Sequence, residues 1–252
     1  MEASRAEAPG LVRDEPPSAS QPAFDIAETL ARMKTDYRSH RGGDGRVSGG
    51  GYSFLYRLGL KPWEFDPTPP ELLFLADHPE VAGGGRRALD LGCGTGRQAL
   101  DVARRGWDVV GVDLVLRAVE RARTRSKEAG VQARFLVGDV TELKELDLGA
   151  PFDLIYDNKC FHGLPPAARL RYAQEVSAVS RSGALYLLFA LPPSPVRSLL
   201  GLPGGVSPAE VSACFSTSFD LLGWRPGGGE PFKPACYWMR RRAEQDRRAA
   251  QR

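Results

Sequence analysis

The sequence predicts an α/β fold with a doubly wound, mostly parallel sheet, and three observations support this prediction. Segments typical of strands and of helices alternate between residues 87 and 190, and such alternation builds crossover units between parallel strands. Two of the strand segments, 154–156 and 184–189, are continuous apolar runs, as in strands buried on both faces. The first strand runs into three glycines on alternate positions, Gly92, Gly94 and Gly96, which permit a tight turn into the next helix.

The predicted elements follow one another in a regular order. Strands are expected at 87–91, 107–112, 132–137, 153–157 and 183–190, and helices at 69–76, 96–105, 115–129 and 166–179. Ser207, Pro208 and Glu210 are typical of a helix start, with serine as the N-cap and glutamate at the third position. Two last strands, 219–224 and 234–241, are expected to pair around the glycines at 227–229.

Composition divides the chain into three parts. Residues 1–50 are predicted to be a flexible segment with one short helix within 24–37 and a glycine-rich linker at 42–51. Residues 51–241 are predicted to form one domain. Residues 242–252 form a basic tail.

Charge and residue usage exclude several classes of protein. The net charge of +3 is concentrated in the six arginines from residue 240 onward, so the rest of the chain is close to neutral, which argues against DNA and disfavours RNA as a partner. Four scattered cysteines and three histidines provide no metal-binding pattern. With no secretion signal and no long apolar run, we expect a cytoplasmic protein without a membrane span, either a monomer or a dimer.

The glycine turn is followed by acids at positions suited to a nucleoside. Asp90 precedes the first glycine by two residues, and Asp113 ends the second predicted strand, where a carboxylate can accept both ribose hydroxyls. The dinucleotide pattern Gly-x-Gly-x-x-Gly fails from Gly92, because its sixth position is Arg97. A relaxed version of this pattern, with alanine in place of the last glycine, runs from Gly94 to Ala99. A nicotinamide cofactor therefore remains an alternative. The Gly-Lys-Ser/Thr of a phosphate-binding loop is missing.

Four motifs in order resemble those of the class I S-adenosylmethionine-dependent methyltransferases. They are Leu-Asp-Leu-Gly-Cys-Gly-Thr-Gly at 89–96, Gly-Val-Asp at 111–113, Phe-Leu-Val-Gly-Asp-Val at 135–140 and Phe-Asp-Leu-Ile-Tyr-Asp at 152–157. The resemblance covers roughly residues 86–190. It implies a Rossmann-like, seven-stranded sheet of order 3-2-1-4-5-7-6 with an N-terminal helical cap.

The resemblance also implies a cofactor, S-adenosyl-L-methionine, and a set of residues that bind it. Asp113 would bind the ribose, Asp139 would face the adenine amino group, and Asn158 would lie near the methionine part. The full implied set is Asp90, Gly92, Cys93, Gly94, Gly96, Asp113, Leu114, Asp139, Val140 and Asn158.

The segment after the fourth strand bears on the acceptor of the methyl group. It lacks the Pro-Pro found in methyltransferases that act on nucleobase amino groups or glutamine amides. This absence argues against DNA, RNA or a protein amide as the acceptor. His162 is the candidate general base, because a neutral imidazole takes up a proton near pH 7; a structural, hydrogen-bonded histidine is the equal alternative. Cys160 is expected to be a buried apolar side chain and Lys159 to be exposed.

Residues 52–66 resemble the cap of small-molecule methyltransferases of the thiopurine S-methyltransferase type, which implies that residues 51–80 form a cap on the domain. Tyr52, Trp63 and Phe161 are therefore the candidate substrate contacts. The predicted function is in-line transfer of a methyl group to a small apolar acceptor, either a thiol or a phenol or quinol hydroxyl. An RNA or protein methyltransferase, a non-catalytic cofactor-binding partner protein and a nicotinamide-dependent dehydrogenase remain as alternatives.

Overall fold

The computed structural model describes residues 67–195, 205–227 and 233–243. The helix expected within 24–37, the glycine-rich linker at 42–51, Tyr52, Trp63 and residues 244–252 lie outside the described residues, as does most of the hairpin turn. The division of the chain into an N-terminal segment, a capped domain and a tail therefore stays a prediction. Within the described part, no helix is both long enough and apolar enough to cross a membrane.

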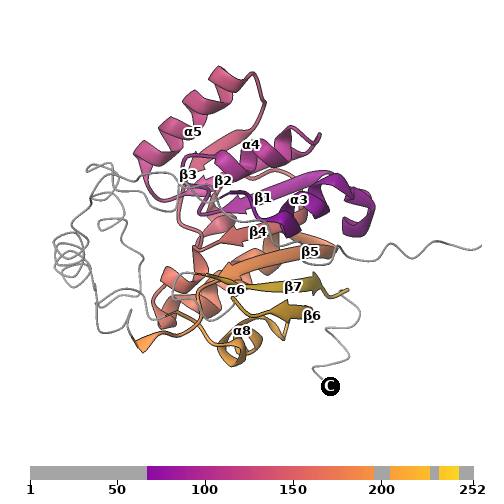
Figure 1. Cartoon of the computed structure of the whole chain (residues 1–252), viewed down its shortest axis with the longest axis vertical. Helices are drawn as coiled ribbons and strands as arrows, with labels where there is room; N and C mark the ends of the chain where they lie inside the picture. Colours follow the sequence, from indigo (N-terminus) through magenta and orange to yellow (C-terminus); the bar gives the residue numbers. More distant parts are fainter. Residues whose placement is uncertain (1–66, 196–204, 228–232, 244–252) are drawn as a thin grey trace, which may run out of the picture.

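A seven-stranded sheet of order β3-β2-β1-β4-β5-β7-β6 forms the centre of the fold (Figure 1). Its first five strands run parallel, whereas β7 is antiparallel to both of its neighbours, β5 and β6. The predicted order and the antiparallel final pair are confirmed. The strands are β1 (Arg87–Leu91), β2 (Asp108–Asp113), β3 (Arg134–Val137), β4 (Phe152–Asn158), β5 (Ser180–Ala190), β6 (Phe219–Arg225) and β7 (Ala235–Arg241).

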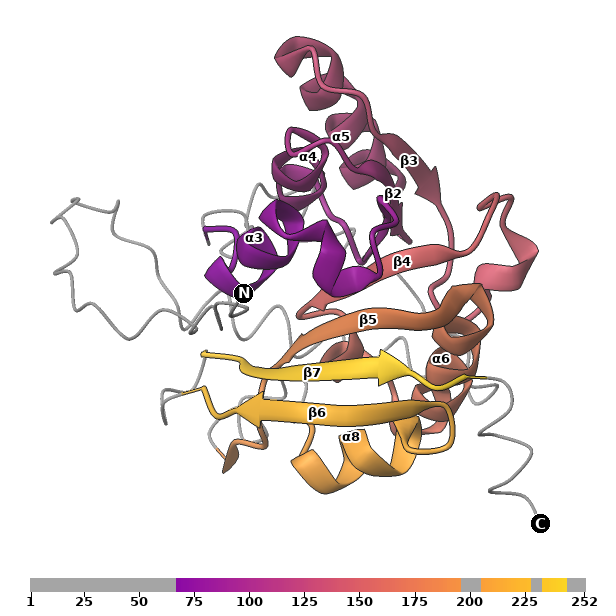
Figure 2. The same cartoon turned by 90° about the vertical axis from the view of Figure 1, so that its right-hand side faces the viewer.

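Helices cover both faces of the sheet, and each face has its own apolar core (Figure 2). On one face lie α3 (Pro70–Asp77), α4 (Arg97–Ala103) and α5 (Leu116–Ala129). On the other lie α6 (Pro166–Val179) and α8 (Pro208–Phe215). Among the residues described, three short 3₁₀ helices join the elements: η2 (Pro79–Ala82), η3 (Leu143–Glu145) and η4 (Phe161–Gly163).

Most observed element boundaries differ from the predicted ones by one to three residues, and two of these differences have an identifiable cause. Helix α4 begins at Arg97, because Gly96 has a left-handed φ of 76° and precedes the helix as its N-cap. Strand β5 begins at Ser180, three residues earlier than predicted, since Ser180 already pairs with Phe152 before a shift in register. The start of α8 is as predicted: Ser207 and Glu210 form a reciprocal capping box.

The register of the central strands sends two acids to opposite faces of the sheet. Asp90 on β1 lies beside Tyr156 on β4, and Tyr156 belongs to the core under α3, α4 and α5. The next residue of β4, Asp157, bonds to Tyr172 of α6 on the other face. Because side chains alternate along a strand, adjacent residues of β4 serve the two different layers of helices.

Candidate cofactor site

The turn between β1 and α4 requires its glycines. Gly92, Gly94 and Gly96 have φ values of 72°, 54° and 76°, a region in which other L-residues are strained. A Cβ atom on Gly92 would lie 2.6 Å from the Cβ of Cys160, and one on Gly96 would lie 2.7 Å from the Phe135 ring. The turn therefore packs tightly against the segment after β4 on one side and against β3 on the other.

Asp113 joins this turn to the end of β2. Its Oδ2 accepts a hydrogen bond from the Gly94 N–H (2.9 Å), and its Oδ1 accepts one from the Val115 N–H (2.8 Å). Burial raises the pKa of Asp113, and the two N–H donors offset part of that effect. Each oxygen of a carboxylate has two lone pairs, so one acceptor position per oxygen remains for ligand hydroxyls.

The remaining predicted residues of the turn region lie beside Asp113. Cys93 is buried and would touch a Cβ placed on Gly111 of β2, and Leu114 is half-buried at the start of the segment leading to α5. After β3, the Oδ1 atom of Asp139 accepts hydrogen bonds from the N–H and the hydroxyl of Thr141, both 2.8 Å long. Val140 is buried in the core of the α6 face.

Three buried polar atoms near the end of β4 and on β1 lack a hydrogen-bond partner within the described residues. They are Oδ2 of Asp90, the hydroxyl of Tyr156 and Oδ1 of Asn158. Burial raises the pKa of Asp90 well above its usual value; the nearby Tyr156 hydroxyl lowers it in part, and Asp157 and Asp113 raise it further. The Tyr156 hydroxyl can donate towards Asp90, whereas Oδ1 of Asn158 has no donor within the described residues. Because buried acceptors without donors are costly, the ends of β1 and β4 mark a place where a ligand with N–H groups or positive charge would be stabilised.

The segment after β4 places the other candidates. His162 lies in η4 and is only 6% exposed, and its carbonyl oxygen accepts a hydrogen bond from Arg169. Phe161 is fully buried, with its ring centroid 5.1 Å from that of Tyr172 and 5.4 Å from that of Phe215. Lys159 is half-buried and has a φ of 74°. The catalytic role of His162 and the substrate role of Phe161 stay predictions.

The three predicted acids and Asp157 all act electrostatically on one side chain, that of Cys160. Four carboxylates, those of Asp157, Asp113, Asp139 and Asp90, raise the pKa of the Cys160 thiol, after the larger effect of burial. These acids come from or directly follow four neighbouring strands at their carboxyl ends, where open α/β sheets bind their ligands. Since Cys160 also contacts the glycine turn, the turn and the acids form one site.

Sequence reasoning missed two side chains that hold this site together. Tyr172 donates a hydrogen bond to Asp157 (2.6 Å). Arg169, buried on α6, donates to the carbonyl oxygens of His162 and Leu164 and pairs with Glu210 of α8. Its position could have been noticed in the sequence, because Arg169 shares a helical stripe with Tyr172, Ala173 and Val176, all of them buried.

One part of the chain is similar to a known family of protein domains. Residues 88–183 match the model of a methyltransferase domain family. These residues include the glycine turn, all four acids and the segment after β4. This similarity agrees with the methyltransferase motifs identified in the sequence.

Two curated relatives match the chain over a similar region. The 2-heptyl-1-hydroxyquinolin-4(1H)-one methyltransferase of Mycobacteroides abscessus is 32% identical over 151 residues, which are 60% of this chain and 64% of the relative. The probable thiol methyltransferase 2 of Arabidopsis thaliana is 28% identical over 145 residues, 58% of this chain and 63% of the relative. The chain thus spans somewhat less than two thirds of the length of these relatives.

Solved methyltransferase structures share the fold. The 1,6-didemethyltoxoflavin-N1-methyltransferase of Burkholderia thailandensis, solved with 1,6-didemethyltoxoflavin and S-adenosylhomocysteine, superposes with a TM-score of 0.61. The two chains are 19% identical, and the match covers 89% of this chain and 94% of the other. At this identity the likeness concerns the arrangement of the sheet and helices.

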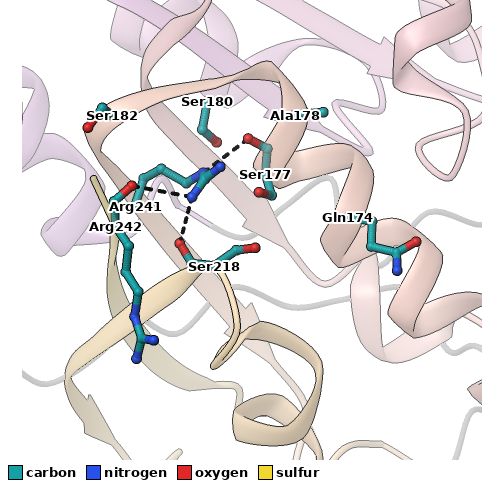
Figure 3. A pocket seen from close by; sticks show the side chains of 8 residues that line it. All are labelled: Gln174, Ser177, Ala178, Ser180, Ser182, Ser218, Arg241 and Arg242. Carbon is teal, nitrogen blue, oxygen red and sulfur yellow. Dashed lines mark hydrogen bonds between the residues drawn. The ribbon is translucent and has the colours of Figure 1, made fainter. Parts of the chain in front are cut away.

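A separate cavity of about 430 Å³ opens at the opposite edge of the sheet, at the start of β5 and the end of β7 (Figure 3). The buried Arg241 guanidinium crosses it and donates to the carbonyl oxygens of Ser177, Ser218 and Arg242. Since Ser177 lies in the last turn of α6, where helix carbonyls lack internal partners, Arg241 stabilises the end of that helix. Arg242, also at this cavity, pairs with Asp220 (2.8 Å). These contacts give the cavity a structural role, remote from the cofactor site.

Proposed function

We propose that this chain transfers a methyl group from S-adenosyl-L-methionine to a small apolar acceptor, either a thiol or a phenol or quinol hydroxyl. The observation that carries the proposal is the pair of buried acceptors without a hydrogen bond in the described residues, Oδ2 of Asp90 and Oδ1 of Asn158, beside the glycine turn. An ammonium group with its N–H donors satisfies such atoms. The methionine end of S-adenosyl-L-methionine carries this group together with a positively charged sulfur.

The other acids suit the opposite end of the same molecule. Asp113 would accept the two ribose hydroxyls while it remains bonded to the turn through Gly94. Both hydrogen bonds that Asp139 receives from Thr141 use Oδ1, so its Oδ2 is suited to an adenine amino group. We therefore assign the adenosine to the ends of β2 and β3 and the methionine part to the ends of β1 and β4.

When bound, S-adenosyl-L-methionine supplies a methyl group on a sulfonium whose sulfur leaves as a neutral thioether. The task of the protein is then mainly to hold an acceptor roughly 3–3.5 Å from that methyl carbon, in line with the departing sulfur. The glycine turn and the acids would hold the cofactor, and with it the methyl group, in a fixed orientation for that approach. Asp90 and Asn158 would hold the charged end of the cofactor against the turn.

Two arguments favour a thiol or hydroxyl acceptor. The relatives described above are named for a hydroxyquinolinone and for thiols. A thiolate attacks with little help from a base, whereas a hydroxyl needs its proton removed as it reacts. His162 is the proposed base for a hydroxyl acceptor; it is buried in η4, so such an acceptor would have to approach it along the loop after β4.

Differential scanning calorimetry of the full chain tests the cofactor. At a hundred times its dissociation constant, S-adenosylhomocysteine should stabilise the protein by about 2.7 kcal/mol and raise its melting temperature, whereas NADH should leave it unchanged. Stabilisation by NADH alone would contradict the proposal and favour a dehydrogenase. With binding established, incubation with S-adenosyl-L-methionine and a panel of aryl thiols, phenols and quinols, followed by mass spectrometry, should reveal a methylated product in one of these classes.

A further inference from the structure

Asp157, the next-to-last residue of β4, makes a set of hydrogen bonds within the chain itself. Its side chain is fully buried and accepts three hydrogen bonds. The N–H of Cys160 donates to Oδ1 (2.8 Å), while the N–H of Phe161 (2.9 Å) and the hydroxyl of Tyr172 (2.6 Å) donate to Oδ2. Two of the three donors belong to the backbone of the loop 158–163, which carries Asn158 and His162.

We propose that Asp157 is a positioning residue that locks the loop 158–163 into the shape needed for cofactor binding. It acts through the backbone of that loop and not by contact with the ligand. The inference rests on the function proposed above, because the loop then supplies Asn158 to the methionine end of the cofactor.

The lock extends from the loop to the glycine turn. The hydrogen bond to the Cys160 N–H sets the position of the Cys160 side chain, which occupies the space beside Gly92 so closely that a Cβ there would be 2.6 Å from the Cys160 Cβ. If the loop moved, the turn would lose the neighbour that fills this space. Asp157 thus connects a buried carboxylate on the α6 face to the turn on the ligand-binding edge.

The loop also needs support from outside itself. Lys159 has a left-handed φ of 74°, which costs free energy for any residue that carries a Cβ. Its N–H donates to the carbonyl oxygen of Phe189 on β5 (2.9 Å). Backbone strain of this kind persists only where surrounding contacts hold it, and the bonds to Asp157 directly after Lys159 are such contacts.

The groups around Asp157 make the lock sensitive to pH. Burial raises its pKa to about 7, although the Tyr172 hydroxyl and the two backbone N–H groups lower it in part. The titratable groups that interact with it are Tyr172 from α6, Tyr186 from β5, Cys160 from the loop and Asp90 from β1. Tyr186 lies 2.9 Å from the Tyr172 oxygen and supports its orientation. An ionised carboxylate accepts hydrogen bonds from all three donors, whereas in a protonated one an oxygen becomes a donor itself. The hydrogen bonds that hold the loop 158–163 should therefore strengthen as pH rises through 7.

The test compares three variants of the full chain with the wild type. Asp157→Asn keeps the shape but replaces one acceptor by an NH₂ group. Tyr172→Phe removes one donor and retains the carboxylate. Tyr237→Phe is the matched control, since it removes a buried tyrosine hydroxyl from β7, where Tyr237 stacks on Trp224. Calorimetry measures the affinity for S-adenosylhomocysteine between pH 6 and 8.5, and hydrogen exchange follows the amides of Cys160 and Phe161.

For Asp157→Asn we expect about tenfold weaker binding at pH 8, a difference that narrows at pH 6, and about tenfold faster exchange of both amides. For Tyr172→Phe the pH dependence of binding should move to higher pH. The Tyr172 hydroxyl lowers the pKa of Asp157 in the wild type, so its removal should raise that pKa. Tyr237→Phe should behave like the wild type. If Asp157→Asn fails to fold, the direction of the Tyr172→Phe shift decides.

The inference would be overturned if Asp157→Asn bound S-adenosylhomocysteine with the affinity and pH dependence of the wild type. It would also be overturned if the pH dependence of binding in Tyr172→Phe did not shift. In either case the proposed function would stand. A wild-type chain that binds no S-adenosylhomocysteine at any pH would contradict the proposed function and this inference with it. The two failures are therefore distinguishable within one experiment.

Discussion

Asp113, the last residue of β2, accepts a hydrogen bond from the backbone N–H of Gly94 in the turn after β1, over 2.9 Å. The acid proposed to bind the ribose thus also fixes the turn proposed to carry the methionine part. The carbonyl oxygen of Val112, one residue earlier, accepts hydrogen bonds from the N–H groups of Gly92 and Cys93. The ends of β1 and β2 consequently form one unit, and a ligand at either part contacts a pre-organised site.

Replacement of Asp113 by alanine should abolish measurable binding of S-adenosylhomocysteine. It removes two acceptors for ribose hydroxyls and frees the Gly94 and Val115 N–H groups, and each lost bond to a carboxylate is worth about 1.5–3 kcal/mol. We expect the affinity to fall by at least about a hundredfold in isothermal titration calorimetry.

Asp108→Ala is the matched control for that substitution. Asp108 lies at the other end of β2, where its exposed carboxylate pairs with Arg87, and such surface pairs contribute little to stability. This variant should retain the affinity of the wild type. Equal affinities for Asp113→Ala and the wild type would remove the acid from the cofactor site.

Gly92→Ala tests the tight approach of the turn to the loop after β4. Alanine at a φ of 72° is strained, and its Cβ would also meet Cys160 at 2.6 Å. Gly130→Ala has the same kind of strain at a φ of 63° but nothing within 4 Å of the added Cβ. We expect Gly130→Ala to lower the free energy of unfolding by about 1–2 kcal/mol, and Gly92→Ala to lower it by clearly more, with loss of binding. Equal costs in urea denaturation would show that the contact with Cys160 is unimportant.

Local patterns allowed much of the fold to be predicted. The alternation of strands and helices, the positive φ of the three glycines and the capping box of Ser207 and Glu210 depend on residues close in sequence. The order of the strands in the sheet, in contrast, was implied by the resemblance of the motifs to those of a known family. The convergence of the acids also followed, because the ends of parallel strands meet at one edge of a sheet. Here the sequence motif and the physical rule lead to the same place.

The contacts that stabilise the site depend on tertiary packing, which single-sequence reasoning does not reveal. Asp157 was seen only as the end of a motif, since its donor Tyr172 lies fifteen residues further on. Arg169 would be expected to face solvent as a charged helical residue, yet it is buried against the loop after β4 and α8. Which side chain satisfies a buried carboxylate is decided by how α6 packs on the sheet.

The buried acids predict that the protein loses stability as pH rises towards 8. Burial raises the folded-state pKa of Asp157 to about 7, and it raises those of Asp90 and Asp113 in the same direction. The folded protein therefore holds protons that the unfolded chain has already released. This contribution to stability is complete below pH 4 and is lost as pH rises through the folded-state pKa.

Urea denaturation at pH 5 and at pH 8 measures this effect. The free energy of unfolding of the wild type, relative to that of Asp157→Asn, should fall by about 1–3 kcal/mol between the two pH values. Asp108→Asn, which changes an exposed carboxylate on β2, should show the wild-type pH dependence. A difference between wild type and Asp157→Asn that stays constant, or grows with pH, would contradict the raised pKa.

His162→Gln separates the two classes of acceptor. Glutamine retains polar atoms of similar reach but takes up no proton near pH 7. If the acceptor is a hydroxyl, loss of the base should lower kcat by about 10²–10⁴-fold, with the affinity for S-adenosylhomocysteine preserved. If it is a thiol, which ionises more readily than a phenol, the loss should stay below about tenfold. Turnover measured over pH 6–9 provides the check, because a hydroxyl acceptor should also lose the low-pH limb of its rate profile in the variant. Small and equal losses with thiols and hydroxyls would leave His162 as a structural residue of η4, held by its backbone contact with Arg169.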